Sequence, residues 1–447
     1  MDRIMLPIRL LFLLSTLPAL SHIEPSSATH SLAALEGETI VFVGARVLPI
    51  ATDPIEDGIM IVRDGRILAV GTKDDVSIPA GAEVRDVSGM ILMPGLVDTH
   101  SHIGGGSGAD NSAPIQPEVR IVDSIDVRSA SIQRAQAGGI TTVNVMPGSG
   151  HLMSGQTVYL KLRDAGTIEE LALRRADGAF AGGMKMANGT NSRGDAPFPG
   201  TRAKSAALVR QQYINAQAYA AKQAAADDGE GEAPDRDLGM EALVEVLDGT
   251  RIVHHHTHRH DDVLTVLRLA EEFGFRVVLH HVSEAWKVAD EIAAAGVPCS
   301  IIVLDSPGGK LEAIDLKMEN GAVLESAGAS VAFHTDDWIT DSRLFLRSAA
   351  LSVRAGMSRT GALAGLTIEG AKMMGLEDRV GSLEVGKDAD FILLDGDPLS
   401  VYTHVQETWI DGERVFDRSD PGDRLWAVGG PGAGEDSHPL CCGGRNQ

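Results

Sequence analysis

The chain has 447 residues, of which 43% are hydrophobic and 23% are charged, so it is long enough to bury a large core. Its 62 acidic residues outnumber 39 lysines and arginines, and the formal net charge of −23 argues against nucleic acid and anionic membranes as partners. Small-molecule substrates fit this composition, and a homo-oligomer is compatible with it.

The first 28 residues have the pattern of a secretory signal peptide. Arg3 and Arg9 precede the apolar run 10–14, and a region rich in Ser, Thr, Pro and Ala follows as far as Ala28. This apolar core is too short to span a bilayer, so a removable signal is favoured over a membrane anchor. We therefore expect a periplasmic or secreted protein that has no membrane contact after cleavage, with a buried N-terminal helix as the alternative.

Two segments far apart in the sequence, 38–90 and 378–418, carry short β-rich runs separated by turn signals such as Asp64-Gly65 and Asp411-Gly412. Such turns join antiparallel strands into hairpins. Because both segments have the same character, we expect one composite β domain, a small β-sandwich split between the two ends of the chain.

Residues 91–377 alternate strand-like and helix-like runs, which is typical of a parallel sheet covered by helices. Eight candidate strands are present, the number that a (β/α)8 TIM barrel needs. They span 91–97, 141–146, 157–162, 179–186, 251–256, 276–281, 299–304 and 330–335. We predict an α/β protein in which this barrel carries the split β domain. A helix over 202–226 is expected outside the barrel, and the Gly- and Pro-rich tail 421–447 is expected to be disordered.

Two histidines, His100 and His102, follow the first of these strands, at the end where a barrel keeps its working residues. Since side chains alternate along a strand, both rings point to the same side. Neutral imidazole is the commonest nitrogen ligand of zinc, so the pair predicts one half of a metal site. A polar loop that holds two histidines by chance is the alternative interpretation.

Other predicted strands also end in imidazole, amine or carboxylate groups. These groups are Lys185, the run His254–His260, the pair His280-His281, His334 and Asp336. In a barrel they converge on one mouth. The histidine run has an incidental polar loop as its alternative. His280 and His281 are expected to point to opposite faces of their strand, so that at most one of them faces the interior.

Lys185 and Asp336 have the side chains that hydrolysis at a metal site would use. Lys185 lies in an apolar strand, where burial favours the neutral amine, and a neutral amine reacts with carbon dioxide to give a carbamate that can bridge two metal ions. Asp336 can accept a proton from a metal-bound water and return it to a leaving amine. The alternatives are a salt-bridged surface lysine and a helix-capping aspartate.

Four motifs stand out along the chain: Met93-Pro-Gly-Leu-Val-Asp-Thr-His-Ser-His102, Gly138-Gly-Ile-Thr-Thr142, His334-Thr-Asp336 and Gly381-Ser-Leu-Glu-Val-Gly-Lys-Asp-Ala-Asp390. With them, the chain resembles the metal-dependent amidohydrolase superfamily from about residue 39 to residue 415. Three further segments are Met146-Pro-Gly-Ser149, Met184-Lys-Met-Ala-Asn-Gly189 and His281-Val-Ser-Glu-Ala-Trp-Lys287. These are similar to a branch of exported imidazolonepropionase-like proteins, some of which are Xaa-Pro dipeptidase-like.

The resemblance implies a site for two divalent metal ions, with zinc favoured. It makes His100 and His102 ligands of the more buried metal and a carbamylated Lys185 the bridge between the two. It assigns His256 and His281 to the second metal, and Asp336 becomes the remaining ligand and the acid/base group. A shift of register would move the role of His256 to His254 or His258, and that of His281 to His280.

The expected activity is hydrolysis of an amide-type C–N bond in a dipeptide, an N-acyl amino acid or a cyclic amide, with a metal-bridging hydroxide as nucleophile. Arg259, near the predicted mouth, is our candidate for holding a substrate carboxylate, and an ion pair with Asp261 or Asp262 is its alternative. A mononuclear deaminase or ring-opening hydrolase on the same fold is the second hypothesis. A catalytically silent binding protein is the third.

Overall fold

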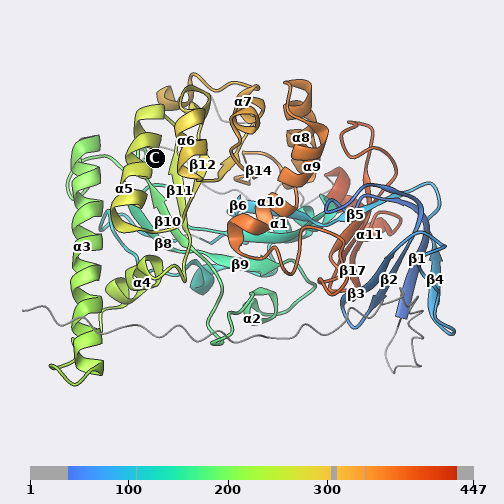
Figure 1. The fold of residues 1–447 in the computed structure, drawn as a ribbon, viewed down its shortest axis with the longest axis horizontal. Coiled ribbons are helices and arrows are strands. Elements are labelled where there is room, and N and C mark those ends of the chain that lie inside the picture. The colour runs from blue at the N-terminus through green and yellow to red at the C-terminus, as the bar shows by residue number, and fades with distance from the viewer. Residues whose placement is uncertain (1–38, 107, 304–309, 338, 430–447) are drawn as a thin grey trace, which may run out of the picture. The chain divides into compact units, whose positions relative to one another are not determined.

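The computed structural model describes residues 39–106, 108–303, 310–337 and 339–429 (Figure 1). The predicted signal peptide, residues 1–28, and most of the predicted tail lie outside the described residues. Within the part of the chain that is described, no helix combines the length and the apolar character that crossing a membrane requires.

An eight-stranded sheet joins the two ends of the described chain. Its strands are β1 (Thr39–Val47), β2 (Ile55–Arg63), β3 (Arg66–Gly71), β4 (Glu83–Asp86), β5 (Ile91–Pro94), β15 (Phe391–Leu394), β16 (Val405–Ile410) and β17 (Glu413–Asp417). The order is β17-β16-β15-β5-β1-β2-β3, and β4 pairs with β1. In Figure 1 the blue strands β1–β4 and the red β17 accordingly lie in the same part of the molecule. The two segments therefore share one sheet, while the domain limits 38–90 and 378–418 and the sandwich form stay predictions.

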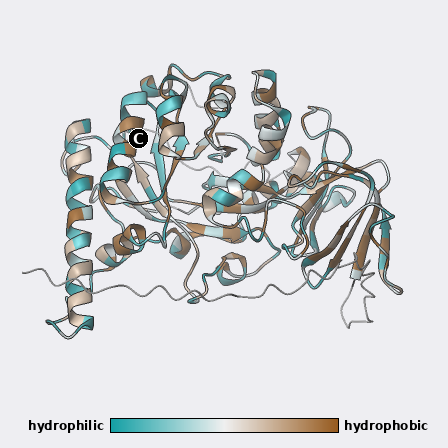
Figure 2. Cartoon of the chain, in the orientation of Figure 1, coloured by the Kyte–Doolittle hydropathy of each residue, from teal (hydrophilic) through white to brown (hydrophobic). Residues whose placement is uncertain are grey.

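Antiparallel pairing of β15 with β5 makes the join between these segments. Phe391 pairs with Pro94 and Leu394 with Ile91. On one face of the sheet, Phe391, Phe42 and Trp409 form a buried aromatic cluster with ring centroids 4.9–5.5 Å apart. Burial of aromatic surface from both ends of the chain stabilises their association. Figure 2 shows the corresponding strands mostly in the brown of hydrophobic residues.

The middle of the chain forms two further sheets. The six-stranded sheet has the order β14-β13-β12-β11-β10-β8 and the three-stranded sheet the order β6-β7-β9. Their strands are β6 (Leu96–Ser101), β7 (Ile140–Val145), β8 (Met153–Gln156), β9 (Val158–Lys161), β10 (Met184–Ala187), β11 (Val253–Thr257), β12 (Val277–His281), β13 (Cys299–Ile301) and β14 (Val331–Phe333). The neighbours from β10 to β14 are parallel, as are β6 and β7.

The sequence predicts eight parallel strands, but two strands of these sheets are antiparallel to a neighbour. The predicted third strand, 157–162, is β9, which is antiparallel to β7, and the preceding β8 is antiparallel to β10. A parallel return needs a crossover of a dozen or more residues, usually a helix, and no helix is formed between β7 and β9. The chain therefore turns back on itself here, and the sheets are mixed.

The helices are α1 (Ala130–Ala137), α2 (Ile168–Leu171), α3 (Arg202–Asp227), α4 (Leu238–Leu247), α5 (His260–Phe273), α6 (Ala289–Ala295), α7 (Asn320–Ala327), α8 (Phe345–Arg354), α9 (Arg359–Gly365), α10 (Ile368–Met374) and α11 (Pro421–Val428). The helix expected over 202–226 is confirmed as α3. Disorder from residue 421 is not what the structure has, because Asp420 caps α11 by accepting hydrogen bonds from the backbone of Gly422 and Asp423, with Pro421 in the first turn.

Helix α5 illustrates how the sequence sets these elements. Asp261 and Asp262 lie in its first turn, where negative charge is favoured, and Gly274 ends it in the left-handed conformation with φ of 75°. Val263, Val266 and two later residues of the same face, Leu269 and Ala270, are buried. This spacing of three and four residues gives one apolar face that packs inward.

The carboxyl end of β14 is tied to β6 through a buried carboxylate. Asp98 in β6 accepts hydrogen bonds from the backbone N–H of Thr335 at 3.1 Å and from its hydroxyl at 2.5 Å. Burial raises the pKa of Asp98 to about 7, against the lowering effect of these hydrogen bonds. Thr335 therefore links the first and last strands of the region that carries the histidines.

We expect Thr335→Val to lower the free energy of unfolding by about 1.5–3 kcal/mol, because the isosteric methyl group leaves the buried Asp98 short of a donor. Chemical denaturation followed by circular dichroism measures this loss. Thr72→Val is the matched control, since the Thr72 hydroxyl donates to Asp75 at the surface. Equal denaturation midpoints for the two variants would contradict the expectation.

Candidate metal centre

His100 and His102 lie at the carboxyl end of β6, with their ring centroids 5.1 Å apart. Nδ1 of His102 donates to the main-chain carbonyl of Met146 at 2.8 Å, because a carbonyl can only accept. Nε2 of His102 therefore presents a lone pair, and it lies 3.0 Å from Oδ1 of Asp336. Two buried acceptors at this separation need a proton or a metal ion between them.

Asp336 is held where its carboxylate meets both histidines. Its backbone N–H donates to the carbonyl of His100 at 2.8 Å, and its φ of 48° is in the left-handed region. Oδ1 also lies 3.4 Å from Nε2 of His100. Burial opposes the ionisation of Asp336, but its interactions with His102, His334 and Lys185 outweigh burial and lower the pKa to about 2. The carboxylate is thus anionic, the form that binds metal.

Lys185 reaches the same place from β10. Its side chain is fully buried, and Nζ lies 3.0 Å from Nε2 of His100 and 3.0 Å from Sδ of Met146. The amine therefore stands beside the nitrogen of His100 that also faces Asp336. This is the position that a bridging group needs, and the carbamate itself stays a prediction.

The histidines in and directly after β11 point to opposite sides because side chains alternate along an extended strand. His254, His256 and His258 share one side, and His255 points to the other, toward α5. Both ring nitrogens of His254 are engaged, one by the hydroxyl of Tyr159 and the other by Nε2 of His280, each at 3.0 Å. Nδ1 of His258 meets the Ser283 hydroxyl and its Nε2 meets Lys310, so of these three histidines His256 is the one that keeps a ring nitrogen without a partner among the described residues.

His256 and His281 come together with their ring centroids 4.4 Å apart. Nδ1 of His256 and Nε2 of His281 are both buried and have no hydrogen-bond partner among the described residues. Nδ1 of His281 meets Nε2 of His334 at 3.1 Å, and Nδ1 of His334 meets the Ser300 hydroxyl at 2.7 Å. This chain of contacts fixes the ring of His281, as partners of a metal-binding imidazole commonly do.

The expectation that only one of His280 and His281 faces the interior is wrong. The ring centroids of both lie within 5.0 Å of the His100 ring. The reason is the left-handed backbone at the strand end, where φ is 68° at His281 and 40° at Val282. Alternation holds only for extended residues, so this twist turns the second ring back to the same side.

Burial sets the protonation of the cluster. It drives the pKa of His100, His256, His281 and two neighbouring imidazoles, His258 and His280, well below the usual value. Coulombic interactions with the neighbouring lysines Lys185 and Lys310 act in the same direction. Neutral imidazole is the form that binds metals. Three sets of ligand atoms lie within 4.8 Å of one another: His100, His280 and His334; His100, His102 and Asp336; and His256, His258 and Glu312.

Arg259 lies where α5 begins, with its guanidinium occupied. Nε and Nη2 donate to the two carboxylate oxygens of Asp261, each at 2.9 Å. This is the ion pair that the sequence left open as an alternative. A role for Arg259 in holding substrate stays a prediction, and it would require this pair to open.

Sequence reasoning missed two charged residues beside the histidines, Lys310 and Glu312. Nζ of Lys310 lies 3.2 Å from Nε2 of His258 and 3.4 Å from Nε2 of His256. Glu312 is buried and accepts from the backbone N–H of Thr190 at 2.7 Å. Neither residue sits at a predicted strand end, and no motif marks them in the sequence.

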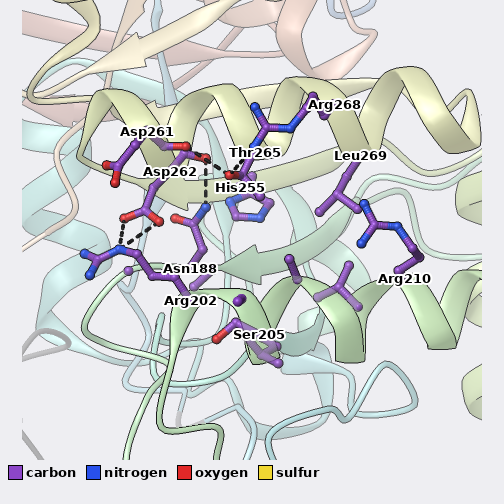
Figure 3. A pocket seen from close by; sticks show the side chains of 16 residues that line it. Asn188, Arg202, Ser205, Arg210, His255, Asp261, Asp262, Thr265, Arg268 and Leu269 are labelled. Atoms are coloured by element: carbon purple, nitrogen blue, oxygen red, sulfur yellow. Dashed lines mark hydrogen bonds and ion pairs between the residues drawn. The ribbon is translucent and has the colours of Figure 1, made fainter.

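A separate pocket lies on the outer side of β11, between α3 and α5 (Figure 3). Its volume is about 440 Å³, and His255 lines it together with Asn188 and Arg268. Arg202 pairs there with Asp262, both of whose oxygens lie within 2.9 Å of Nε. Since His255 and His256 point to opposite sides of the strand, this pocket is distinct from the histidine cluster.

Parallel strands that alternate with helices and end in a cluster of neutral imidazoles, a buried lysine and an anionic aspartate define a metal-binding α/β enzyme. The chain belongs to the Amidohydrolase family, whose model matches residues 91–415. An amidohydrolase from Thermotoga maritima MSB8 has a similar solved structure, with a TM-score of 0.78 at 35% identity over 85% of this chain and 100% of that one. The fold is therefore TIM-barrel-like with mixed sheets.

Two curated relatives show the range of the family. An amidohydrolase named tasK from Hapsidospora irregularis is 28% identical over 80% of this chain, which spans only 40% of that longer protein. An imidazolonepropionase from Sphingopyxis alaskensis is 25% identical over 80% of this chain and 92% of its own length. Prolidases are among the solved structures that share the fold, at 18% and 19% identity.

These findings confirm the resemblance to the metal-dependent amidohydrolase superfamily. The protein is an enzyme that hydrolyses C–N bonds and acts on small molecules. The catalytically silent binding protein is thereby set aside. The residues that hold metal, the number of metal ions and the substrate are not established by family membership.

Proposed function

We propose that the protein hydrolyses an amide-type C–N bond at a site for two divalent cations, most simply zinc. The observation that carries this proposal is the contact between Nε2 of His102 and Oδ1 of Asp336, two acceptors 3.0 Å apart with the other histidines around them. The inner cation would be held by His100, His102 and Asp336. Nδ1 of His256 and Nε2 of His281, which have no hydrogen-bond partner among the described residues, would hold the second cation.

Lys185 would join the two positions as a carbamate. Its neutral Nζ would add to carbon dioxide and lose one proton, and the resulting carbamate would supply an anionic ligand that the two cations could share. Support comes from its burial in β10 and from the 3.0 Å between Nζ and Nε2 of His100. A lysine that stays an amine would leave the two halves of the site without a shared anionic ligand.

When bound, the cations supply an activated water and polarise the substrate carbonyl. The protein's own part in the reaction is then proton movement. Asp336 takes a proton from the attacking water as the new C–O bond forms, and it returns that proton to the nitrogen as the C–N bond breaks. The contact with His102 would hold the carboxylate in place for both transfers.

Dipeptides, N-acyl amino acids and cyclic amides all carry the bond that this site would cut. A mononuclear deaminase or ring-opening hydrolase remains the second candidate, favoured by the similarity to an imidazolonepropionase. It requires one tightly bound metal and an unmodified Lys185. We also propose that the protein is exported, on the strength of the N-terminal sequence alone.

Elemental analysis of protein prepared with zinc and bicarbonate tests the binuclear site. We expect two metal ions per chain in the wild type, falling to one or none in Lys185→Ala, because the variant loses the shared ligand. Lys204→Ala is the matched control, since Lys204 is exposed on α3. An unchanged metal count in Lys185→Ala would rule out the carbamate bridge, and a single metal in the wild type would favour the mononuclear alternative.

A further inference from the structure

Lys310 is a cation at the rim of the histidine cluster that the proposed chemistry does not use. It follows β13 and precedes the short helix Leu311–Ala313. Its ammonium lies 3.2 Å from Nε2 of His258 and 3.4 Å from Nε2 of His256, and the side chain is 12% exposed. The group is thus close to the metal-binding histidines and still within reach of a small molecule at the mouth.

The acidic partner of Lys310 leaves its charge only partly compensated. Among the described residues, Glu312 is the one carboxylate within 4.0 Å, with Oε1 at 3.6 Å, beyond normal hydrogen-bond length. The other oxygen of Glu312 accepts from Thr190 and lies 3.7 Å from Nη2 of Arg202. Glu312 is therefore divided among several donors, and Lys310 keeps capacity for a further anion.

The side-chain amide of Asn191 is a second donor that contacts the imidazole of His256. Nδ2 of Asn191 lies 3.3 Å from Nε2 of His256 and donates to the Ser149 hydroxyl at 2.8 Å. Lys310 and Asn191 thus share one acceptor nitrogen. If Nδ1 of His256 binds a cation, as proposed above, Nε2 must carry the ring proton and ceases to accept. Asn191 and Lys310 then both lose the acceptor that they share, and of its two imidazole contacts Lys310 keeps only the one with Nε2 of His258 at 3.2 Å.

We propose that Lys310, assisted by Asn191, binds a carboxylate of the substrate and so selects amides that carry one, such as N-acyl amino acids and dipeptides, over neutral amides. This inference rests on the proposed function, because it places the carboxylate beside the cation held by His256. It gives to Lys310 the recognition role that the sequence suggested for Arg259, whose guanidinium Asp261 already occupies. Lys310 acts as a specificity-determining residue.

The test compares N-acetyl-L-amino acids with the corresponding N-acetyl-L-amino acid amides, using zinc-loaded full-length protein. These pairs share the scissile acetamide and differ only in the carboxylate. We expect the wild type to favour the acids in kcat/KM. Lys310→Met should lower kcat/KM for the acids about 10- to 100-fold, mainly through KM, and change that for the amides less than threefold. Lys310→Arg should restore part of the preference.

Two further variants and one possible outcome test whether Lys310 recognises the carboxylate or has only a structural role. Lys317→Met replaces an exposed lysine in the same region and should leave the acid-to-amide ratio unchanged. Equal losses on acids and amides in Lys310→Met would mean that the residue is merely structural, and would overturn the proposal. The proposal would also be overturned if Arg259→Met lost the preference for acids while Lys310→Met kept it.

Binding and metal content keep the two proposals distinguishable. Calorimetric titration of the zinc-loaded protein with N-acetyl-L-amino acids reports carboxylate binding even where turnover is slow. We expect Lys310→Met to weaken this binding at least tenfold while retaining the wild-type metal count. If the wild type binds acids no better than amides, the role of Lys310 is refuted, whatever the metal count. If Lys185→Ala keeps its metal but Lys310→Met still loses acid binding, the carbamate fails and the inference stands.

Discussion

Replacing Asp336 by asparagine is expected to lower kcat by about 10²–10⁴-fold on any substrate that the wild type turns over. Asparagine keeps the shape of the side chain and tolerates the left-handed backbone at this position, where φ is 48°. It cannot take up and return a proton in the way that the carboxylate does. The variant therefore removes the proposed proton transfer while preserving the fold, and steady-state kinetics measure the effect.

Metal content must be measured in the same samples, because Asp336 is also a proposed ligand. Asp341→Asn is the matched control: Asp341 is a half-buried carboxylate nearby that pairs with Arg343 and caps a short helix. We expect its kcat to stay within a few-fold of the wild type. An Asp336→Asn enzyme that is folded and fully active would show that another group moves the proton.

Much of this site follows from local sequence. The alternation of side chains in an extended strand suffices to place His100 and His102 on one side, and the same rule separates His255 from its two neighbours. The alternation of strands and helices likewise predicts that β10 and β11 are parallel, so that their carboxyl ends lie at one edge of the sheet. These predictions hold because each depends on a few neighbouring residues.

Other features depend on contacts that no local pattern encodes. His281 joins His280 on one side only because the backbone leaves the extended region, which tertiary packing decides. Lys310 lies two residues before Glu312, which accepts a hydrogen bond from Thr190, a residue far away in the sequence. Helix α11, by contrast, had a readable signal in Asp420 followed by Pro421, an N-cap and a favoured first residue.

A buried charge cluster joins β9 to the eight-stranded sheet and was not foreseen either. The side chain of Lys161 is fully buried, and its ammonium contacts Asp388, Asp390 and Asp411. Asp388 and Asp390 belong to the segment leading into β15, and Asp411 lies in the turn between β16 and β17. One lysine therefore holds three carboxylates that come from the far end of the sequence.

Removal of this ammonium leaves the buried Asp390 without the cation that it contacts, whereas Asp388 keeps Arg66 and Arg379 and Asp411 keeps Arg163. Burial already raises the pKa of Asp390 to about 6, although Lys161 acts to lower it, and Lys161 lowers the pKa of Asp411 against the effect of burial. Breaking a buried charge cluster by deleting one partner typically costs about 3–5 kcal/mol. We expect Lys161→Met to lower the free energy of unfolding by about that amount at pH 8.

The loss should shrink as the pH falls. Without Lys161 the pKa of Asp390 rises further above that of the unfolded chain, so the folded state binds more protons and gains stability on acidification from pH 8 to pH 6. Urea denaturation followed by circular dichroism at both pH values measures this. Arg163→Met is the matched control, because Arg163 also pairs with Asp411 but is 31% exposed, and we expect it to cost at most about 1 kcal/mol. Equal losses for the two variants at pH 8 would mean that the other cations around Asp388, Arg66 and Arg379, compensate the buried charge.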